Sequence, residues 1–305
     1  MLVFSDTQAI LGALIVKIHK NITGRYVEFL HPSWCSEFLF EEKYRDECIK
    51  LTFDFLFDNL KIKFARFDLP ADSPNLRPLI QQCKSHKVHF RITPIMGHII
   101  VPLTSNWAEF QKSRTKHHRR TFARIEKKLS KAGSWQTSYN EGNVGANIVE
   151  RILKVEGKSW KEKYYTKRNA SDWTLRLLLN ASQLQTRTDP SFRWSVWFLT
   201  LNGKTIAYQL ANEYKEVAYF LKTSYDEQYQ ALSPGAFIIN TAIHELFDKK
   251  QNKHIDFLTD FPYLQTWSKK CVLRITITLT KGNISNVLQY ILENPLIQRI
   301  LQFVF

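Results

Sequence analysis

The sequence lacks any long hydrophobic run. No stretch reaches 18 consecutive apolar residues, and the best candidate, residues 10–16, ends at Lys17, so no membrane-spanning helix is predicted. The N-terminus has no basic stretch before that run and no A-x-A-like cleavage site, which argues against a secretory signal peptide. We therefore expect a soluble, cytoplasmic protein.

Cysteine, glycine and proline are all scarce. The four cysteines form no C-x-x-C pair, so neither a zinc site nor a dense disulfide framework is predicted, and no metal is expected. Glycine and proline number only 10 each, which excludes a linker-rich chain. With 305 residues, 44% hydrophobic and 13% aromatic, the chain can bury one large core or two smaller ones.

Three common catalytic motifs are also missing. Gly157-Lys158-Ser159 resembles the end of a phosphate-binding P-loop, but Ile152 stands where the first glycine belongs. His244-Glu245 begins a zinc-peptidase motif, but Asp248 replaces the second histidine. No G-x-S-x-G elbow is present. P-loop kinases, zinc peptidases and lipase-like hydrolases are therefore not favoured.

Positive charge, by contrast, is abundant and uneven. The chain has 43 basic and 28 acidic residues, and the segment from Lys112 to Lys131 holds nine basic residues and one acid. Phe122, Ile125 and Leu129 form an apolar stripe there, and Asn106 with Glu109 fits a capping box, which predicts one long basic amphipathic helix. Its charged face fits a merely solvated surface, a site for an anionic cofactor or substrate, or a nucleic-acid surface.

Strand and helix patterns alternate along the chain. The first half predicts a helix within residues 38–59, strands at 64–69, 88–92 and 98–103 with a turn at 94–97, and a helix at 76–83. In the second half, Asn202-Gly203 predicts a hairpin between strands 193–201 and 204–213. Further segments are strands at 134–139, 217–223, 254–258 and 272–280, and helices at 145–160, 173–184, 234–250 and from 282 onward.

The segment 230–236 combines a polar loop with a helix start at Pro234-Gly235, directly after a predicted strand. A helix N-terminus exposes unpaired backbone N–H groups and the positive end of the helix dipole. Glycine in the first turn lets a phosphate approach the backbone. The sequence therefore predicts a pyrophosphate-binding site here.

This loop resembles the acyl-CoA loop of the GNAT acyltransferases, with Gln230 at the first position, Gly235 at the last and Ser233 in place of the middle glycine. More specifically, the chain is similar to the CelD/FemAB-like family, whose members carry two GNAT-like units. The pieces that carry this likeness are Trp107–Phe110, Arg119–Leu129, Ser159–Lys161, Phe198–Tyr208, Tyr225-Asp226, Ser233–Gly235, Ile255–Leu258 and Pro262–Trp267.

The resemblance implies a mixed α/β fold of two GNAT-like units, each a mostly antiparallel sheet flanked by helices. We place the first unit at residues 1–105 and the second at 106–305, the second beginning with the basic helix as a bridge. The implied activity is transfer of an acyl group, most simply acetyl from acetyl-CoA, to an amine or hydroxyl of a sugar, a glycan precursor or another small molecule. No metal takes part.

The resemblance also implies roles for particular residues. Gln230, Ser233, Gly235 and Ala236 would bind the cofactor, Asp256 or Asp260 would be the base, and Tyr263 the acid for the leaving thiolate. Trp160 and Arg120 would contact the acceptor.

Two rival functions stay open. One is a FemAB-like transfer from aminoacyl-tRNA, although specific nucleic-acid binding is not favoured. The other is an inactive binding module, because relatives usually have glycine at the position of Asp260 and lysine at that of Leu264.

Overall fold

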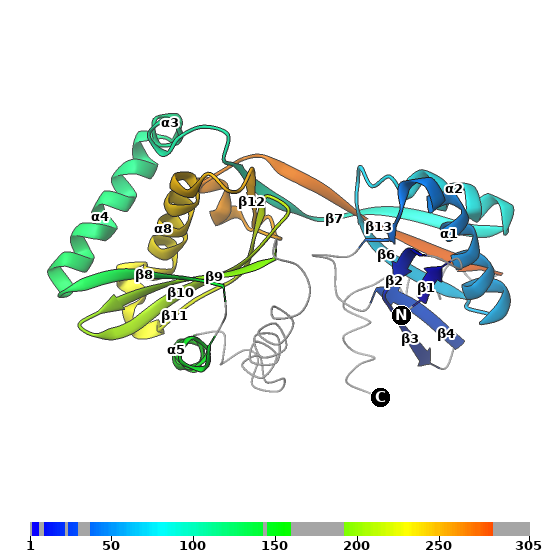
Figure 1. The fold of residues 1–305 in the computed structure, drawn as a ribbon, viewed down its shortest axis with the longest axis horizontal. Coiled ribbons are helices and arrows are strands. Elements are labelled where there is room, and N and C mark those ends of the chain that lie inside the picture. Colours follow the sequence, from blue (N-terminus) through cyan, green and yellow to red (C-terminus); the bar gives the residue numbers. More distant parts are fainter. Residues whose placement is uncertain are drawn as a thin grey trace. The chain divides into compact units, whose positions relative to one another are not determined.

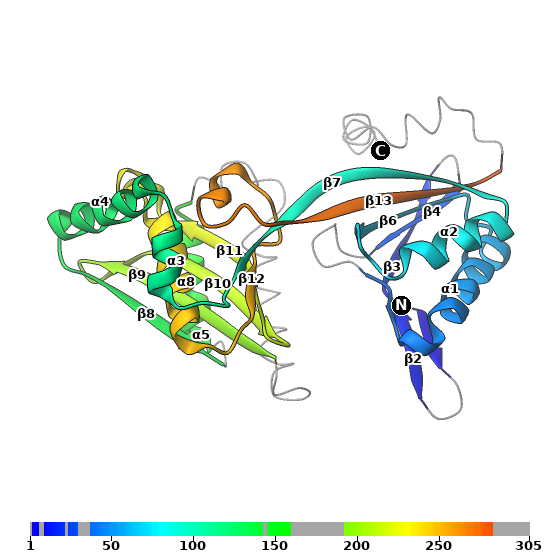
Figure 2. The same cartoon turned by 90° about the horizontal axis from the view of Figure 1, so that it is seen from above.

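The computed structural model describes residues 2–5, 9–21, 24–29, 37–142, 145–159 and 192–282. By its contacts the chain divides into two compact units, Met1–Gly97 with Val272–Phe305, and His98–Cys271. Two strands pass from one unit into the other along the chain, β7 (Val88–Pro102) and β13 (Cys271–Lys281). Each unit combines strands with helices, so the fold is mixed α/β as predicted (Figures 1 and 2).

The first unit contains a three-stranded sheet, part of a ten-stranded sheet and two α-helices. Its remaining elements are β1 (Leu2–Ser5), β2 (Ile10–Leu14), β3 (Val16–Asn21), β4 (Gly24–Phe29), β5 (Leu39–Phe40), η1 (Glu42–Tyr44), α1 (Arg45–Phe53), η2 (Asp54–Asn59), β6 (Phe64–Pro70) and α2 (Leu76–Ser85). Strand β13 pairs antiparallel with β6, and its Ile275, Ile277 and Leu279 alternate into the core of this unit. Thus the predicted strand at 272–280 belongs to the first unit, although it lies late in the sequence.

Strand β7 corrects one prediction. The sequence predicted two strands separated by a turn at Pro94–Gly97, but one strand runs from Val88 to Pro102. Residues 89–94 are all exposed. A proline in an exposed part of a strand leaves no buried carbonyl without a donor, so Pro94 does not interrupt the strand here.

The second unit carries the predicted pattern of the second half. Its elements are α3 (Trp107–Ser113), α4 (Lys116–Ala132), β8 (Trp135–Glu141), α5 (Ala146–Glu156), β9 (Arg193–Leu201), β10 (Lys204–Tyr214), β11 (Val217–Tyr225), η3 (Glu227–Leu232), α8 (Pro234–Lys249), β12 (His254–Asp256) and η4 (Pro262–Thr266). Its strands follow the order β7-β12-β11-β10-β9-β8. Only β11 and β12 are parallel, so the sheet is mixed and mostly antiparallel.

The hairpin between β9 and β10 forms as predicted. Asn202 and Gly203 both have positive φ angles, 50° and 77°, which is the conformation that a two-residue turn of this hand requires. The strands then pair from Leu201–Lys204 to Arg193–Glu213, with one register shift near Thr205. Both faces of β9 and β10 are buried. This explains their nearly continuous apolar sequence.

Helices cover both faces of this sheet. Helices α4 and α8 pack on one face with Ile99, Val101, Phe220 and Ile255, and α5 packs on the other with Phe198, Tyr208 and Leu210 as part of a separate apolar cluster. Figure 1 shows α4 and α8 on one side of β8–β11 and α5 on the opposite side. Among the described residues, no helix is long and apolar enough to span a membrane.

The predicted long basic helix is in fact two helices. Asn106 caps α3 by accepting a hydrogen bond from the Glu109 N–H at 2.9 Å, which confirms the predicted cap. The backbone is extended at Arg114 and Thr115, and Thr115 caps α4 through the His118 N–H at 3.1 Å. A threonine that caps a new helix favours this break.

Some predictions lie outside the described residues. These are Trp160, the helix at 173–184 and the C-terminal helix. The predicted boundary at 105/106, and the bridging role of the basic helix, stay predictions about domain organisation. Helices α3 and α4 both lie in the second unit, which begins at His98 by contacts.

Candidate active site

The central feature of the second unit is the β11–α8–β12 crossover. Helix α8 follows β11 after the short η3 helix, and β12 then pairs parallel to β11. That pairing covers only Val217–Tyr219 with His254–Asp256, whereas β11 continues to Tyr225. Six of the nine β11 residues therefore extend beyond the paired region, so the two strands part after Tyr219 and Asp256.

Helix α8 begins without a side-chain cap. Ser233 has a left-handed backbone with φ of 52° and ψ of 47°, and its side chain makes no capping hydrogen bond. The Phe237 N–H donates to the Ser233 carbonyl at 3.2 Å, and Pro234 has no N–H. The N–H groups of Gly235 and Ala236 precede this first helical bond and are the donors that the helix leaves for an external acceptor.

The four predicted cofactor residues thus lie together. Gln230 is exposed in η3, and its carbonyl accepts from the Ser233 N–H at 2.9 Å. A Cβ atom added to Gly235 would lie 3.0 Å from Cδ1 of Tyr225. The glycine therefore allows α8 to pack against the end of β11, a role that the sequence did not predict and that does not exclude contact with a phosphate.

Helix α4 lies beside this loop. The Lys128 ammonium donates to the Ala231 carbonyl at 3.1 Å, and Trp135, just after α4, packs edge-on against Phe237 with ring centroids 5.2 Å apart. Arg120 is exposed and lies eight residues before Lys128, about 12 Å away along the helix. The structure therefore brings Lys128 to the predicted anion site, and Arg120 belongs to the same helix without contacting the loop.

Asp256 ends β12, where the two strands part. One carboxylate oxygen accepts a hydrogen bond from the Leu258 N–H at 2.6 Å, and the other lies 3.2 Å from Nδ1 of His98. The His98 side chain is 6% exposed and that of Asp256 is 14% exposed. Sequence reasoning missed His98, because 158 positions separate it from Asp256 and no motif marks it.

Asp260 and Tyr263, which follow β12 in the sequence, differ in how far they are buried. Asp260 is half-buried, and Tyr263 is 58% exposed, with its ring stacked against Phe261 at a centroid distance of 6.2 Å. Burial raises the pKa of the Cys271 thiol, and the charges of Asp260 and Asp256 raise it further. Both aspartates therefore lie near Cys271, and that thiol is held in its neutral form rather than as a nucleophilic thiolate.

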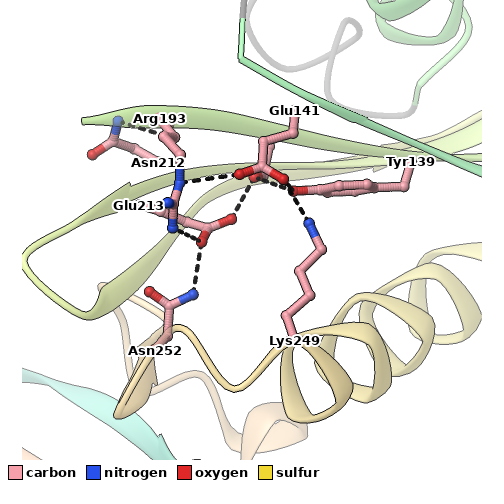
Figure 3. Close-up of polar contacts among 8 residues, drawn as sticks. Tyr139, Glu141, Arg193, Asn212, Glu213, Lys249 and Asn252 are labelled. Carbon is pink, nitrogen blue, oxygen red and sulfur yellow. Dashed lines mark hydrogen bonds and ion pairs between the residues drawn. The ribbon is translucent and has the colours of Figure 1, made fainter. Parts of the chain in front are cut away.

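A second polar cluster lies at the other end of α8 (Figure 3). It consists of Tyr139, Glu141, Arg193, Ser195, Asn212, Glu213, Lys249 and Asn252. Glu213 is 1% exposed and accepts from Ser195, from Asn252 at 2.7 Å and from Arg193 at 3.3 Å.

The two carboxylates of this cluster are balanced by two cations. Glu141 pairs with Lys249 at 2.8 Å and with Arg193 at 3.1 Å. Burial by itself would raise the pKa of Glu141, but the hydrogen bonds from Lys249 and Tyr139 outweigh it and lower that pKa. Because its donors and acceptors satisfy one another, this cluster stabilises the fold and offers no group for catalysis.

One group of possible metal ligands lies in the first unit. Potential ligand atoms of Asp54, Asp58 and His86 are within 4.8 Å of one another. The Lys281 ammonium already lies 2.5 Å from Asp58, and this interaction lowers the pKa of that carboxyl. Because the side chain of Lys281 already neutralises the Asp58 carboxylate, we assign no metal to this group.

Comparisons with known proteins agree with this geometry. Residues 116–263 match the acetyltransferase (GNAT) domain family. A conserved protein of unknown function from Bacteroides thetaiotaomicron has a similar structure, with a TM-score of 0.57 and 12% identity over 88% of this chain and 85% of that chain.

Two further solved structures share the fold. One is L-PGS from Bacillus licheniformis, with a TM-score of 0.56 and 11% identity over 93% of this chain and 86% of that chain. The other is FemX, with a TM-score of 0.57 and 10% identity over 95% of this chain and 89% of that chain. At these identities the likeness concerns the fold alone. No curated protein sequence matches the chain.

Proposed function

Because residues 116–263 form an acetyltransferase (GNAT) domain, we propose that this chain transfers an acyl group from acyl-CoA to an acceptor amine or hydroxyl. Acetyl-CoA is the simplest donor. The observation that carries the proposal is the uncapped start of α8 at the end of β11, within a crossover whose strands part after three paired residues.

The donor's pyrophosphate would bind at the start of α8. The N–H groups of Gly235 and Ala236 offer two hydrogen bonds, and the helix dipole adds partial positive charge at the same point. Lys128 lies against the loop at Ala231 and adds a full positive charge. This combination favours a diphosphate over a neutral ligand, and it needs no metal.

The thioester would then lie where β11 and β12 part. From Tyr225 back to Tyr219 is six residues of strand, about 20 Å at the usual rise. The extended pantetheine arm of coenzyme A suits such a path along the edge of β11. A backbone N–H of β11 that no longer faces β12 could donate to the oxyanion that forms during attack on the thioester.

The acceptor would approach from the segment after β12. Asp260, Phe261 and Tyr263 lie there, and the two aromatic side chains are 49% and 58% exposed. Because its side chain is exposed, Tyr263 is accessible to an acceptor, and we keep it as a proposed site residue. Arg120 and Trp160 remain proposed acceptor contacts, Trp160 lying outside the described residues.

One observation favours a second candidate, transfer from aminoacyl-tRNA. Arg120, Arg124, Lys128 and Lys131 recur at three- and four-residue spacing along α4 and are exposed, which forms a basic stripe ending at the α8 loop. FemX and L-PGS share the fold. A tRNA acceptor end could follow such a stripe, because neutralised phosphates release counterions.

Thermal unfolding with each ligand separates the candidates. At 100 times its dissociation constant, a ligand that binds only the folded state stabilises it by about 2.7 kcal/mol. We expect acetyl-CoA to raise the melting temperature and total tRNA to leave it unchanged at physiological salt. Stabilisation by tRNA alone would favour the second candidate. Stabilisation by neither ligand would leave the inactive binding module.

A further inference from the structure

The buried His98 pairs with the partly exposed Asp256, and the sequence assigned these two residues no joint role. Nδ1 of His98 lies 3.2 Å from one Asp256 oxygen, and the other oxygen accepts from the Leu258 N–H at 2.6 Å. Leu258 has a left-handed backbone with φ of 56°, so the chain turns sharply here to make that contact. Both carboxylate oxygens are therefore engaged, and Asp256 itself is poorly placed to take a proton from a substrate.

The pair lies where the proposed chemistry takes place. Asp256 is opposite Tyr219, the last β11 residue in register with β12. One apolar core joins α8 to the sheet and contains Ile99, Val101, Phe220 and Ile255. Because side chains alternate along a strand, His98 and Asp256 face the opposite side of the sheet, away from α8.

The hydrogen bond also fixes the form of the imidazole. A carboxylate can only accept, so the proton of a neutral His98 ring resides on Nδ1. Nε2 then presents its lone pair, and no partner for Nε2 is seen in the described part of the chain. An imidazole held this way by a carboxylate is arranged to accept a proton.

The neighbouring thiol is not a competing nucleophile. Burial, followed by the charges of Asp260 and Asp256, raises the pKa of Cys271, and a hydrogen bond with the His98 backbone only partly offsets this. A thiol in this state does not form an acyl-enzyme at neutral pH. The acyl group would therefore pass directly from the donor to the acceptor.

We propose that His98 is the general base of this site, that Asp256 positions it, and that the acceptor group is a hydroxyl. This rests on the proposed acyl-CoA function. His98 Nε2 takes the hydroxyl proton as the oxygen attacks the thioester carbon. The new C–O bond forms and the C–S bond breaks. The proton passes from His98 to the departing thiolate, so that the histidine returns to its neutral form and Tyr263 is not needed as the acid.

The choice of a hydroxyl follows from the nature of the base. A hydroxyl is a weak nucleophile until an adjacent base removes its proton, whereas an amine needs only to be neutral to attack. A buried imidazole oriented by a carboxylate meets the stricter requirement of the hydroxyl, which must lose its proton during the attack, whereas an amine needs a base only to lose its ammonium proton beforehand.

The test uses water as the acceptor, so that no acceptor needs to be identified. Release of CoA thiol from acetyl-CoA is followed for the whole chain, for His98→Gln and for Asp256→Asn. We expect His98→Gln to lower this rate at least 100-fold, within the range of about 10²–10⁴ typical of a general base. Asp256→Asn should lower it more than tenfold and, in ¹⁵N-histidine spectra, should disturb the single Nδ1–H form of His98.

Affinity for acetyl-CoA is measured by calorimetry on the same proteins and should change less than twofold. Cys271→Ser is the matched control and should keep the full rate. A His98→Gln protein that binds acetyl-CoA and releases thiol at the wild-type rate would overturn the inference, as would transfer to D-glucosamine nitrogen that survives His98→Gln. Absence of acetyl-CoA binding by the wild type would instead refute the proposed function.

Discussion

The two ends of α8 differ in how their polar groups are satisfied. At its C-terminal end, Lys249 joins a network in which Glu213 and Glu141 are fully paired (Figure 3). At its N-terminal end, Ser233 provides no side-chain cap, and the N–H groups of Gly235 and Ala236 have no acceptor within the helix. Both ends are rich in polar residues, so polarity by itself does not identify the site.

What differs is the balance of donors and acceptors. In the C-terminal cluster, the carboxylates of Glu141 and Glu213 are neutralised by Arg193 and Lys249, so the cluster has no charge left to bind a ligand. The N-terminal end carries donors, the helix dipole and Lys128, which in the described part of the chain donates to the Ala231 carbonyl and pairs with no carboxylate. A polar network whose groups all have partners contributes stability, whereas backbone donors without a partner at a helix start indicate a binding site for an anion.

A substitution in the Glu213 cluster at the C-terminal end of α8 should have the largest effect on stability. Glu213→Ala removes the acceptor of Ser195, Asn252 and Arg193, and loss of one partner of a buried network typically costs about 3–5 kcal/mol. We expect that loss in the free energy of unfolding in urea, with acetyl-CoA affinity of the folded protein unchanged.

The matched control is Glu150→Ala on α5, whose exposed pair with Lys154 should leave the free energy of unfolding nearly unchanged. If acetyl-CoA affinity fell with Glu213→Ala, the Glu213 cluster would belong to the binding site after all.

His118 sharpens the comparison because it is buried yet unpaired. It is 4% exposed, and neither ring nitrogen has a hydrogen-bond partner in the described part of the chain. Burial, followed by the charges of Arg114 and Arg119, lowers its pKa to about 4. Between pH 6.5 and 4 the unfolded chain binds this proton and the folded one does not, so stability is lost as the pH falls through that range.

The loss from this group between pH 7 and pH 5 should be about 2 kcal/mol. In His118→Leu it should disappear, as measured by urea unfolding at the two pH values. His117→Leu alters the exposed neighbour and serves as the control, with an expected change below about 0.5 kcal/mol at pH 7. Equal pH dependence in wild type and His118→Leu would contradict the burial of an uncharged imidazole.

The smallest effects are expected on the basic stripe. Arg120→Ala and Arg124→Ala remove exposed charges, and each should change stability by less than about 0.5 kcal/mol. Neither should alter acetyl-CoA affinity if the anion site is confined to the α8 loop and Lys128. A submicromolar tRNA complex at physiological salt that both substitutions weaken would support the aminoacyl-tRNA candidate instead.

The sequence predicted the local parts of the site well. Pro234 and Gly235 marked the start of α8, and Asn202-Gly203 marked the hairpin, because both signals act within a few residues. The one-helix prediction for the basic segment was wrong at Arg114, because the apolar stripe continues through a break that Thr115 caps. The capping residue Thr115 therefore determines where α4 begins, which the periodicity of the apolar residues did not indicate.

Contacts between distant segments were not predictable in this way. The His98–Asp256 pair joins residues 158 positions apart, and β13 returns to pair with β6 of the first unit. The Glu213 network collects side chains from β8, β9, β10 and the end of α8. Such contacts depend on sheet order and register, for which a single sequence carries no local signal.

Substitution of Ala236 is the sharpest test of pyrophosphate binding at the start of α8. Gly235 is less suitable, because any side chain there would also meet Tyr225. Ala236→Asp and Ala236→Asn differ in charge and hardly in size, so calorimetric titration with acetyl-CoA compares charge alone. We predict that Ala236→Asp weakens binding at least tenfold, about 1.4 kcal/mol, relative to Ala236→Asn. Equal affinities of the two variants for acetyl-CoA would contradict pyrophosphate binding at this position.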